Sequence, residues 1–313
     1  MASPLSEIPD HLLAEIFLRL PNPEDLVRAS VACVSFHRLA TDGSFLRRFR
    51  RLHAPPVLGF LWAGGMFYPT LPPHPSAPAA RALDLAADFY FTFIPSYYRW
   101  TVQDIRDGRV LLEGDIEKDE RPPVFKDLAV CDPLHLRYVL LPPLPHDLAA
   151  SLEHPFPMVS EARCKEVAAG EATFRVILMA NCKTSLDAFV FSSSTGQWEA
   201  AASKGWSDLA LSEGDMAKMS WVHPYILRRH YAYGCFYWDW VEFGRKKLLL
   251  LDTRSRKMEF SIADLPPGEW SRKGGIAIVE AGEGKLGMFA FHGETSSDLS
   301  YTIARNKGKS PSQ

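Results

Sequence analysis

The stretch GEGK at 282–285 contains the residues of this sequence that come nearest to a phosphate-binding loop. Such a loop needs an upstream glycine at fixed spacing, a Ser or Thr after the lysine, and a helix that follows. Leu286 follows the lysine here, and the stretch lies between the apolar runs AIVEA and LGMFAF. The sequence therefore predicts a tight hairpin turn at GEGK rather than a nucleotide site.

The sequence also lacks the residue patterns that are typical of metal ligation and of nucleophilic catalysis. The ten histidines form no H-x-x-x-H pair and lie near no second ligand type at metal spacing. Ser192–Thr195 lack the G-x-S-x-G pattern of an activated serine. The five cysteines are scattered and never form C-x-x-C, which favours a reducing compartment over a disulfide framework. We expect no catalytic residue, no metal and no cofactor, and hence a protein that is not an enzyme.

Tryptophans are the side chains of the second half that could anchor a protein partner. In CFYWDW at 235–240, strand alternation would place Trp238 and Trp240 on one face, with Tyr237 and Asp239 on the other. Packing between sheets is one interpretation of these side chains. The other is that they bind a client protein, because Trp and Tyr dominate binding hot spots. The candidates for client binding are Trp238, Trp240 and Trp270.

The amino-acid composition and charge limit the classes to which this protein can belong. Hydrophobic residues make up 47% of the chain and charged residues 23%, so a sizeable core is available. The net charge of -2 provides no basic face for nucleic acid. RRFRR at 47–51 is interpreted as the solvated face of a helix with Phe49 turned inward, and nuclear import is the minor alternative. The chain shows no membrane-length apolar run, and its start predicts no secretory leader, so we expect cytoplasmic and/or nuclear localisation.

The first 50 residues have the apolar spacing of helices. Pro9-Asp10 marks a helix start with Asp10 as the expected N-cap, and Pro21-Asn22-Pro23 ends that helix. Further helical pieces are expected from Glu24, around 35–40 and around 44–52.

Beyond Pro55-Pro56 short apolar runs alternate with Gly, Pro, Asp and Ser, which is typical of an all-β region. Three segments in this region align without gaps, and their third positions are Asp132, Ser192 and Asp252. Both intervals are 60 residues, and each segment is expected to be the outer hairpin of a four-stranded unit. Repeated four-stranded units predict a β-propeller, with a β-sandwich as the alternative.

A fourth unit begins with GIAIVEAGEGKLGMFAFHG and reaches LSYTIAR, and one strand is missing by analogy with the others. We therefore expect an open propeller in which PVLGFLWAG and DFYFTFIP fill part of the gap. The expected organisation is α+β in two domains: a helical module at 1–50, a linker at 51–56, a propeller-like domain at 57–305 that is incomplete at its C-terminal end, and a disordered tail at 306–313.

The helical module resembles an F-box. The F-box pattern is matched by Ile8-Pro9-Asp10, Leu12/Leu13, Ile16, Leu20-Pro21, Asp25-Leu26, Cys33 and Leu39. The departures are Ala32, Val34, Phe36 and His37 in the third helix. The β region is similar to the F-box-associated propellers of plant proteins, especially those of grasses, in blocks such as AVCDPLHLRYVLLPPLP and FVFSSSTGQWE.

This resemblance implies the substrate receptor of an SCF-type cullin–RING ubiquitin ligase. The F-box would bind a Skp-type adaptor, and the β domain would bind an unknown client protein for ubiquitination. No nucleic acid or membrane partner is expected. The alternative is a protein-interaction scaffold whose degenerate F-box no longer engages a ligase. The residues expected to contact the adaptor are Ile8, Pro9, Leu12, Ile16, Leu20, Leu26, Val34 and Phe36.

Overall fold

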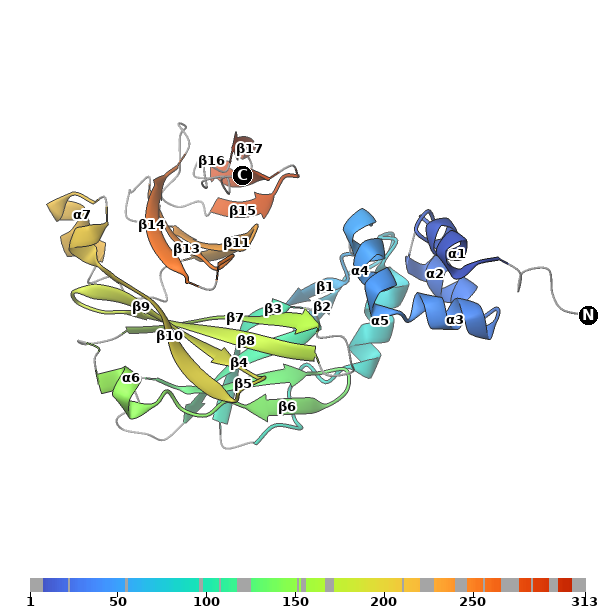
Figure 1. Ribbon diagram of the computed structural model, residues 1–313, viewed down its shortest axis with the longest axis horizontal. Coiled ribbons are helices and arrows are strands. Elements are labelled where there is room, and N and C mark those ends of the chain that lie inside the picture. Colours follow the sequence, from blue (N-terminus) through green and yellow to red (C-terminus); the bar gives the residue numbers. More distant parts are fainter. Residues whose placement is uncertain are drawn as a thin grey trace, which may run out of the picture. The chain divides into compact units, whose positions relative to one another are not determined.

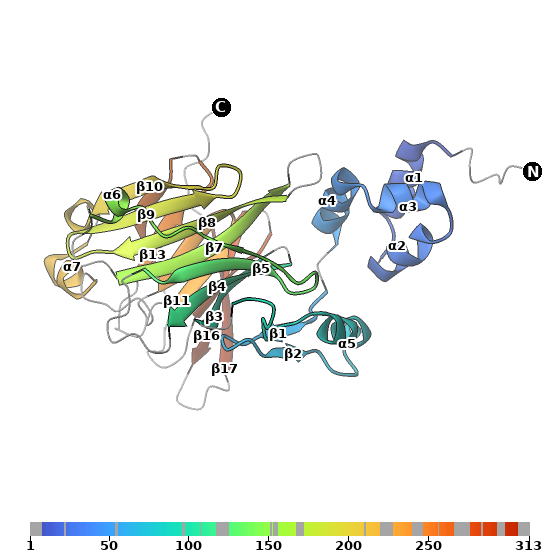
Figure 2. The same ribbon diagram turned by 90° about the horizontal axis from the view of Figure 1, so that it is seen from below.

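The computed structural model contains the whole chain (Figures 1 and 2). The residues it describes are 8–21, 23–53, 56–95, 98–106, 108–116, 125–150, 152, 156–166, 172–209, 211–219, 228–239, 247–255, 257–265, 276–282, 284–292 and 298–305. The expected tail at 306–313 therefore lies outside the described residues.

The chain divides into two compact units. The first unit comprises the described residues of Met1–Leu61, Phe67–Ala86 and Glu166–Glu171, and the second comprises those of Trp62–Met66, Ala87–Lys165 and Ala172–Gln313. The structure thus groups residues 57–61 and 67–86 with the N-terminal helices, whereas the sequence analysis assigned them to the β domain.

Four helices open the first unit, as the apolar spacing predicts. They are α1 (Asp10–Phe17), α2 (Pro23–Ser30), α3 (Val34–Ala40) and α4 (Gly43–Leu52). Pro23 occupies the first helical position of α2, where its missing N–H costs nothing. Asp42 caps α4, since its carboxylate accepts a hydrogen bond from the N–H of Phe45 at 2.8 Å.

The expected role of Asp10 as N-cap is wrong. Pro9 is the N-cap of α1, and its carbonyl oxygen accepts hydrogen bonds from the N–H groups of Leu12 and Leu13. Asp10 is the first residue inside the helix, which frees its carboxylate to bond Arg38 of α3 at 2.8 Å. Position in the cap depends on backbone dihedrals, which the residue type alone does not determine.

A short hairpin and one helix complete the first unit. The strands are β1 (Gly59–Leu61) and β2 (Phe67–Pro69), which pair only with each other among the described residues, and α5 (Ala77–Ala86) contacts β2. The predicted strand in PVLGFLWAG is thus present as β1, and its partner among the described residues is β2.

The described residues of the second unit form three four-stranded antiparallel sheets and one three-stranded sheet. The first sheet is β3 (Tyr98–Arg106), β4 (Arg109–Ile116), β5 (Asp127–Asp132) and β6 (Arg137–Leu140). The second is β7 (Phe156–Glu166), β8 (Ala172–Asn181), β9 (Ser185–Ser192) and β10 (Gln197–Gly205), whose strands lie side by side in Figure 2. The third is β11 (Arg228–Ala232), β12 (Cys235–Asp239), β13 (Lys247–Asp252) and β14 (Glu259–Asp264).

The last sheet is β15 (Ile276–Glu280), β16 (Lys285–His292) and β17 (Asp298–Arg305), so it has one strand fewer than the others among the described residues. Helix α6 (His146–Ala150) follows β6, and the 3-10 helix η2 (Trp206–Asp208) and α7 (Glu213–Met219) follow β10. None of the described helices has the length and apolar character needed to cross a membrane.

The 60-residue repeat coincides with the sheets. Asp132, Ser192 and Asp252 are the last residues of β5, β9 and β13, the third strand of each four-stranded sheet. Each therefore precedes the turn to the outer strand, which the alignment of the three segments predicted. GEGK joins β15 to β16 as a hairpin connection, with positive φ at Gly282 and Gly284, which confirms the predicted turn.

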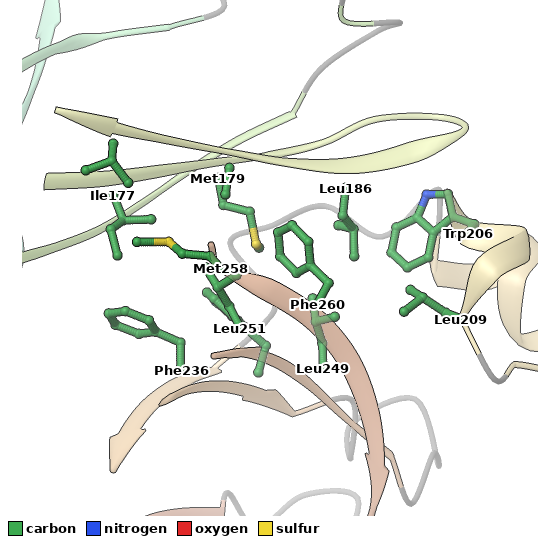
Figure 3. Close-up of a cluster of buried hydrophobic side chains, with 13 residues drawn as sticks. Ile177, Met179, Leu186, Trp206, Leu209, Phe236, Leu249, Leu251, Met258 and Phe260 are labelled. Carbon is green, nitrogen blue, oxygen red and sulfur yellow. The ribbon is translucent and has the colours of Figure 1, made fainter. Parts of the chain in front are cut away.

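The sheets stack face to face in chain order. Apolar residues of β8 and β9 meet those of β12, β13 and β14 in one cluster, which Figure 3 shows between the second and third sheets. A second cluster joins the first and second sheets, and a third joins the third and fourth sheets.

The predicted strand DFYFTFIP at 88–95 is wrong. The Asp88 carboxylate accepts hydrogen bonds from the N–H groups of Tyr90 and Thr92, and these bonds fold the chain into turns.

Trp238 carries much of this packing. It is 2% exposed and contacts Phe236 within the cluster of the second and third sheets. Trp238→Ala should lower the free energy of unfolding by about 3–5 kcal/mol, because it leaves a cavity between the sheets. Urea denaturation followed by far-UV circular dichroism measures this loss. Trp62→Ala is the control, since Trp62 is 59% exposed, and an equal loss in both variants would contradict the assigned packing.

Acid should destabilise the turn after β5. Burial raises the pKa of Asp132, but hydrogen bonds from the N–H and ring of His135 and from the N–H of Leu134 outweigh burial and hold that pKa below its ordinary value. The carboxylate therefore stabilises the folded state above the unfolded pKa of about 4, and this contribution disappears as pH falls through the folded pKa.

Asp132→Asn should therefore reduce stability at pH 6 and have a smaller effect at pH 3, as measured by urea denaturation across pH. Ser192→Asn at the equivalent position of the second sheet is the control and should add no such pH dependence. A constant difference between wild type and Asp132→Asn would contradict this prediction.

Candidate adaptor-binding surface of the N-terminal helices

The four N-terminal helices surround a small core. Its buried members are Leu13, Ala14, Phe17, Leu18, Leu26, Ala40, Phe45 and Phe49. The ring of Phe17 meets Phe36 edge to face at 5.1 Å and Phe45 at 6.4 Å, so one α1 side chain contacts both α3 and α4. Phe49 is 3% exposed, which confirms that it points inward from the RRFRR stretch.

Two ion pairs tie the later helices to α1. Arg38 of α3 bonds Asp10 at 2.8 Å, and Arg48 of α4 bonds Glu15 at 2.6 Å. All four side chains are more than half exposed, so each pair contributes well under about 1 kcal/mol. Their effect is to orient α3 and α4 on α1, while the apolar core supplies the stability.

Large apolar side chains remain outside this core. Leu12 and Ile16 are 50% and 52% exposed and lie four residues apart, hence on one face of α1. Val34 at the start of α3 is 85% exposed. A small module that leaves such side chains in water presents an apolar surface suited to a protein partner.

The structure divides the eight predicted contact residues into two groups. Pro9, Leu12, Ile16 and Val34 are exposed, as an adaptor contact requires. Leu26 is 5% exposed and belongs to the module's own core, so its predicted place on the surface is a correction. Ile8, Leu20 and Phe36 are partly buried against the same core. Helical spacing marks apolar faces but does not tell an inner face from an outer one.

Two exposed residues were missed by the sequence analysis. Val27 on α2 is 63% exposed, and Val31 directly after α2 is 80% exposed. Val27 neighbours the buried Leu26, so it points away from the core. Adjacent residues of a helix point in different directions, so the place of Val27 beside a core leucine in an eight-residue helix could have indicated its exposure.

The tryptophan candidates for client binding do not form an exposed site. Trp238 is buried between two sheets and has no surface left for a partner, which corrects its predicted role. Trp240 and Trp270 lie outside the described residues. The alternation predicted for CFYWDW is present, since Phe236 and Trp238 face the second sheet while Cys235 and Tyr237 face the fourth.

The other candidates for chemistry in the β domain are its metal-ligating and nucleophilic side chains. No group of three or more His, Cys, Asp or Glu residues that could hold a metal occurs among the described residues. Burial raises the pKa of the Cys131 thiol to about 12, and burial followed by the charge of Asp252 raises that of Cys235. Both thiols are therefore protonated near neutral pH and are poor nucleophiles.

One cluster of ionisable side chains joins the first and third sheets. Asp104 lies 3.3 Å from Arg106 and 3.4 Å from Arg229, and Arg229 donates a 2.6 Å hydrogen bond to the Gln103 carbonyl oxygen. The Arg106 guanidinium lies 3.8 Å from the centre of the Tyr231 ring. This arrangement links β3 to β11, and its chemistry is that of a structural ion-pair network.

Comparison with protein families identifies the helical module. Its described residues form the four-helix arrangement above, and residues 5–52 match the F-box-like family. The chain therefore contains an F-box-like region at residues 5–52, and a β-rich domain follows it. No curated protein matches the chain.

Two of the solved structures that match the chain are distant from it in sequence. The intramolecular trans-sialidase of Ruminococcus gnavus, solved with oseltamivir carboxylate, is 10% identical with a TM-score of 0.30, covering 68% of this chain and 46% of that one. An α-L-arabinanase of Penicillium chrysogenum, solved with arabinobiose, is 10% identical with a TM-score of 0.34, covering 69% of this chain and 65% of that one. The chain thus spans less than two thirds of either protein. TM-scores this low carry no argument about the fold or activity of this chain.

Adjacent leucines of α1 should respond differently to a charge. Leu12→Asp should change the free energy of unfolding by no more than about 0.5 kcal/mol, because Leu12 is half exposed. Leu13→Asp should cost at least about 3 kcal/mol, because Leu13 is 3% exposed in the core. Thermal unfolding followed by circular dichroism at 222 nm compares the two variants. Equal losses would show that α1 is rotated from the position described.

Proposed function

We propose that this protein is the substrate-recognition subunit of an SCF-type cullin–RING ubiquitin ligase. Its F-box-like domain binds a Skp-type adaptor, and its β domain binds the client protein. The match of residues 5–52 to the F-box-like family is the observation that supports this proposal. The β domain is proposed to be an open propeller of four units that acts inside the cell.

The exposed apolar residues supply the driving force for adaptor binding. Leu12, Ile16 and Val34 are half to largely exposed on helices that already have a packed core. Removing such side chains from water contributes about 1 kcal/mol or more for each. Val27 and Val31 belong to the same proposed surface, which extends the set predicted from the sequence.

The proposed mechanism is proximity without chemistry on this chain. Holding a client and a ligase on one receptor raises the effective concentration of the client's lysines near the charged ubiquitin carrier. The receptor is proposed to be non-catalytic, to need no cofactor and to have no nucleic acid or membrane partner. A scaffold that no longer engages a ligase is the competing function, and adaptor binding separates the two.

Ile16→Asp should weaken binding to a purified Skp-type adaptor at least about 100-fold, because it leaves a charge in a desolvated apolar contact. Isothermal titration calorimetry with the full chain measures this change. Ile16 is 52% exposed, so the variant should fold as wild type does. Leu52→Asp is the matched control, since Leu52 is 65% exposed in the same module and lies outside the proposed contact set.

Two results would overturn the proposal. Wild-type protein that fails to bind the adaptor at high micromolar concentration would favour the scaffold. Equal losses in Ile16→Asp and Leu52→Asp would mean that the assigned surface is not the adaptor contact.

A further inference from the structure

Among the described residues, the last sheet of the β domain ends in an open edge. In each of the first three sheets, the third strand is hydrogen-bonded on both sides, because an outer fourth strand covers it. In the last sheet, β17 takes the place of the third strand and is hydrogen-bonded to β16 alone among the described residues. A strand in this position presents a row of backbone N–H and C=O groups to any extended chain.

The exposed side chains of β17 distinguish it from its counterparts. Tyr301 is 47% exposed and Ile303 is 55% exposed, whereas the central residues of β5, β9 and β13 are mostly buried. The Tyr301 ring lies 4.5 Å from that of Phe289, which is opposite it on β16. Gly287 is opposite Ile303, and the Tyr301 ring occupies the space that a side chain at position 287 would fill. Tyr301 and Ile303 therefore lie on one face of the last sheet, where the Tyr301 ring covers Gly287 of β16.

The residue types at the two ends of β17 indicate which residues would be favourable in a strand that pairs with its open edge. The strand starts at an acidic residue, Asp298, and ends at a basic residue, Arg305. The register places Arg305 opposite Lys285, a residue of the same charge, so an acidic neighbour on the other side would be favourable. Two other sheets pair their third and fourth strands in this manner: Asp132 is opposite Arg137, and Lys247 bonds Asp264 at 3.0 Å.

We propose that the β17 edge binds an extended segment of a partner protein by strand addition. The segment runs antiparallel to β17, as the fourth strand does in the other sheets. It has an acidic residue opposite Arg305, apolar residues opposite Ile303 and Tyr301, and a basic residue opposite Asp298. The order in its sequence is therefore acidic, any, apolar, any, apolar, any, any, basic.

This surface would be a client site if the protein is a ligase receptor, and that assignment rests on the proposed function. Strand binding itself does not depend on the adaptor. Failure of peptide binding and failure of adaptor binding are therefore separate results.

The test measures binding of a labelled peptide to the full chain by fluorescence anisotropy. The probe is the capped peptide Glu-Thr-Val-Thr-Phe-Thr-Val-Lys, and the matched control exchanges its Glu and Lys. The probe should bind at least about fivefold more tightly than the exchanged peptide, because two attractive end pairs become repulsive. Of two probes methylated on alternate backbone amides, only the one whose methyl groups face β17 should lose binding, because strand addition needs those N–H groups.

Protein variants locate the site. Ile303→Asp should weaken binding at least about tenfold, and its exposure means that folding is retained, as circular dichroism can verify. Leu140→Asp is the control on β6, the outer strand of the first sheet, where Leu140 is 41% exposed, and it should leave binding unchanged.

Four outcomes overturn the proposal. They are no binding of the probe, equal affinity for the exchanged peptide, equal tolerance of both methylated probes, and loss of binding in Leu140→Asp but not in Ile303→Asp. Self-association that Ile303→Asp abolishes, without peptide binding, would identify a second copy of the chain as the occupant instead.

Discussion

The architecture of the β domain depends on sheets that are apolar on both faces. In β8, Val176 and Leu178 pack toward the first sheet, while Ile177 and Met179 pack toward the third. A sheet of this kind is stable only when both faces are removed from water, so each sheet requires a neighbour on either side. Stacking in chain order satisfies this need for the second and third sheets. Among the described residues, the last sheet is covered on one face, and Tyr301 and Ile303 are exposed on the other.

Polar contacts add specificity to this apolar stack. Arg229 joins β11 to the Gln103 carbonyl oxygen and to Asp104, so the first and third sheets are linked directly as well as through the second. His230 lies between Asp239 of the next strand and the N–H of Ile278 on β15, which links the third sheet to the fourth. Partly buried contacts of this kind fix which sheets meet and how they are aligned along their strands, because a shift by one residue would leave polar groups unpaired.

The F-box-like domain follows a different rule, since it is too small to bury all its apolar residues. Phe17 contacts both Phe36 and Phe45, and this three-helix contact is the centre of its core. Leu12 and Ile16 lie on a different face of the same helix and remain in water. A short helix with apolar residues on both sides can be stable and still present a surface for a partner, and this division underlies the proposed adaptor contact.

The sequence by itself determined the two kinds of structure, the positions of the four N-terminal helices, the 60-residue repeat and the short final sheet. These follow from local patterns: proline and capping residues bound the helices, alternation marks the strands, and Asp132, Ser192 and Asp252 recur at the same point of each unit. Only the tertiary structure decided which apolar residues face inward. Leu26 and Trp238 are buried and Val27 is exposed because facing elements cover or leave them, and those elements lie elsewhere in the sequence. The segment at 88–95 shows the same limit, since hydrogen bonds from the N–H groups of Tyr90 and Thr92 to the Asp88 carboxylate override a strand-like apolar pattern.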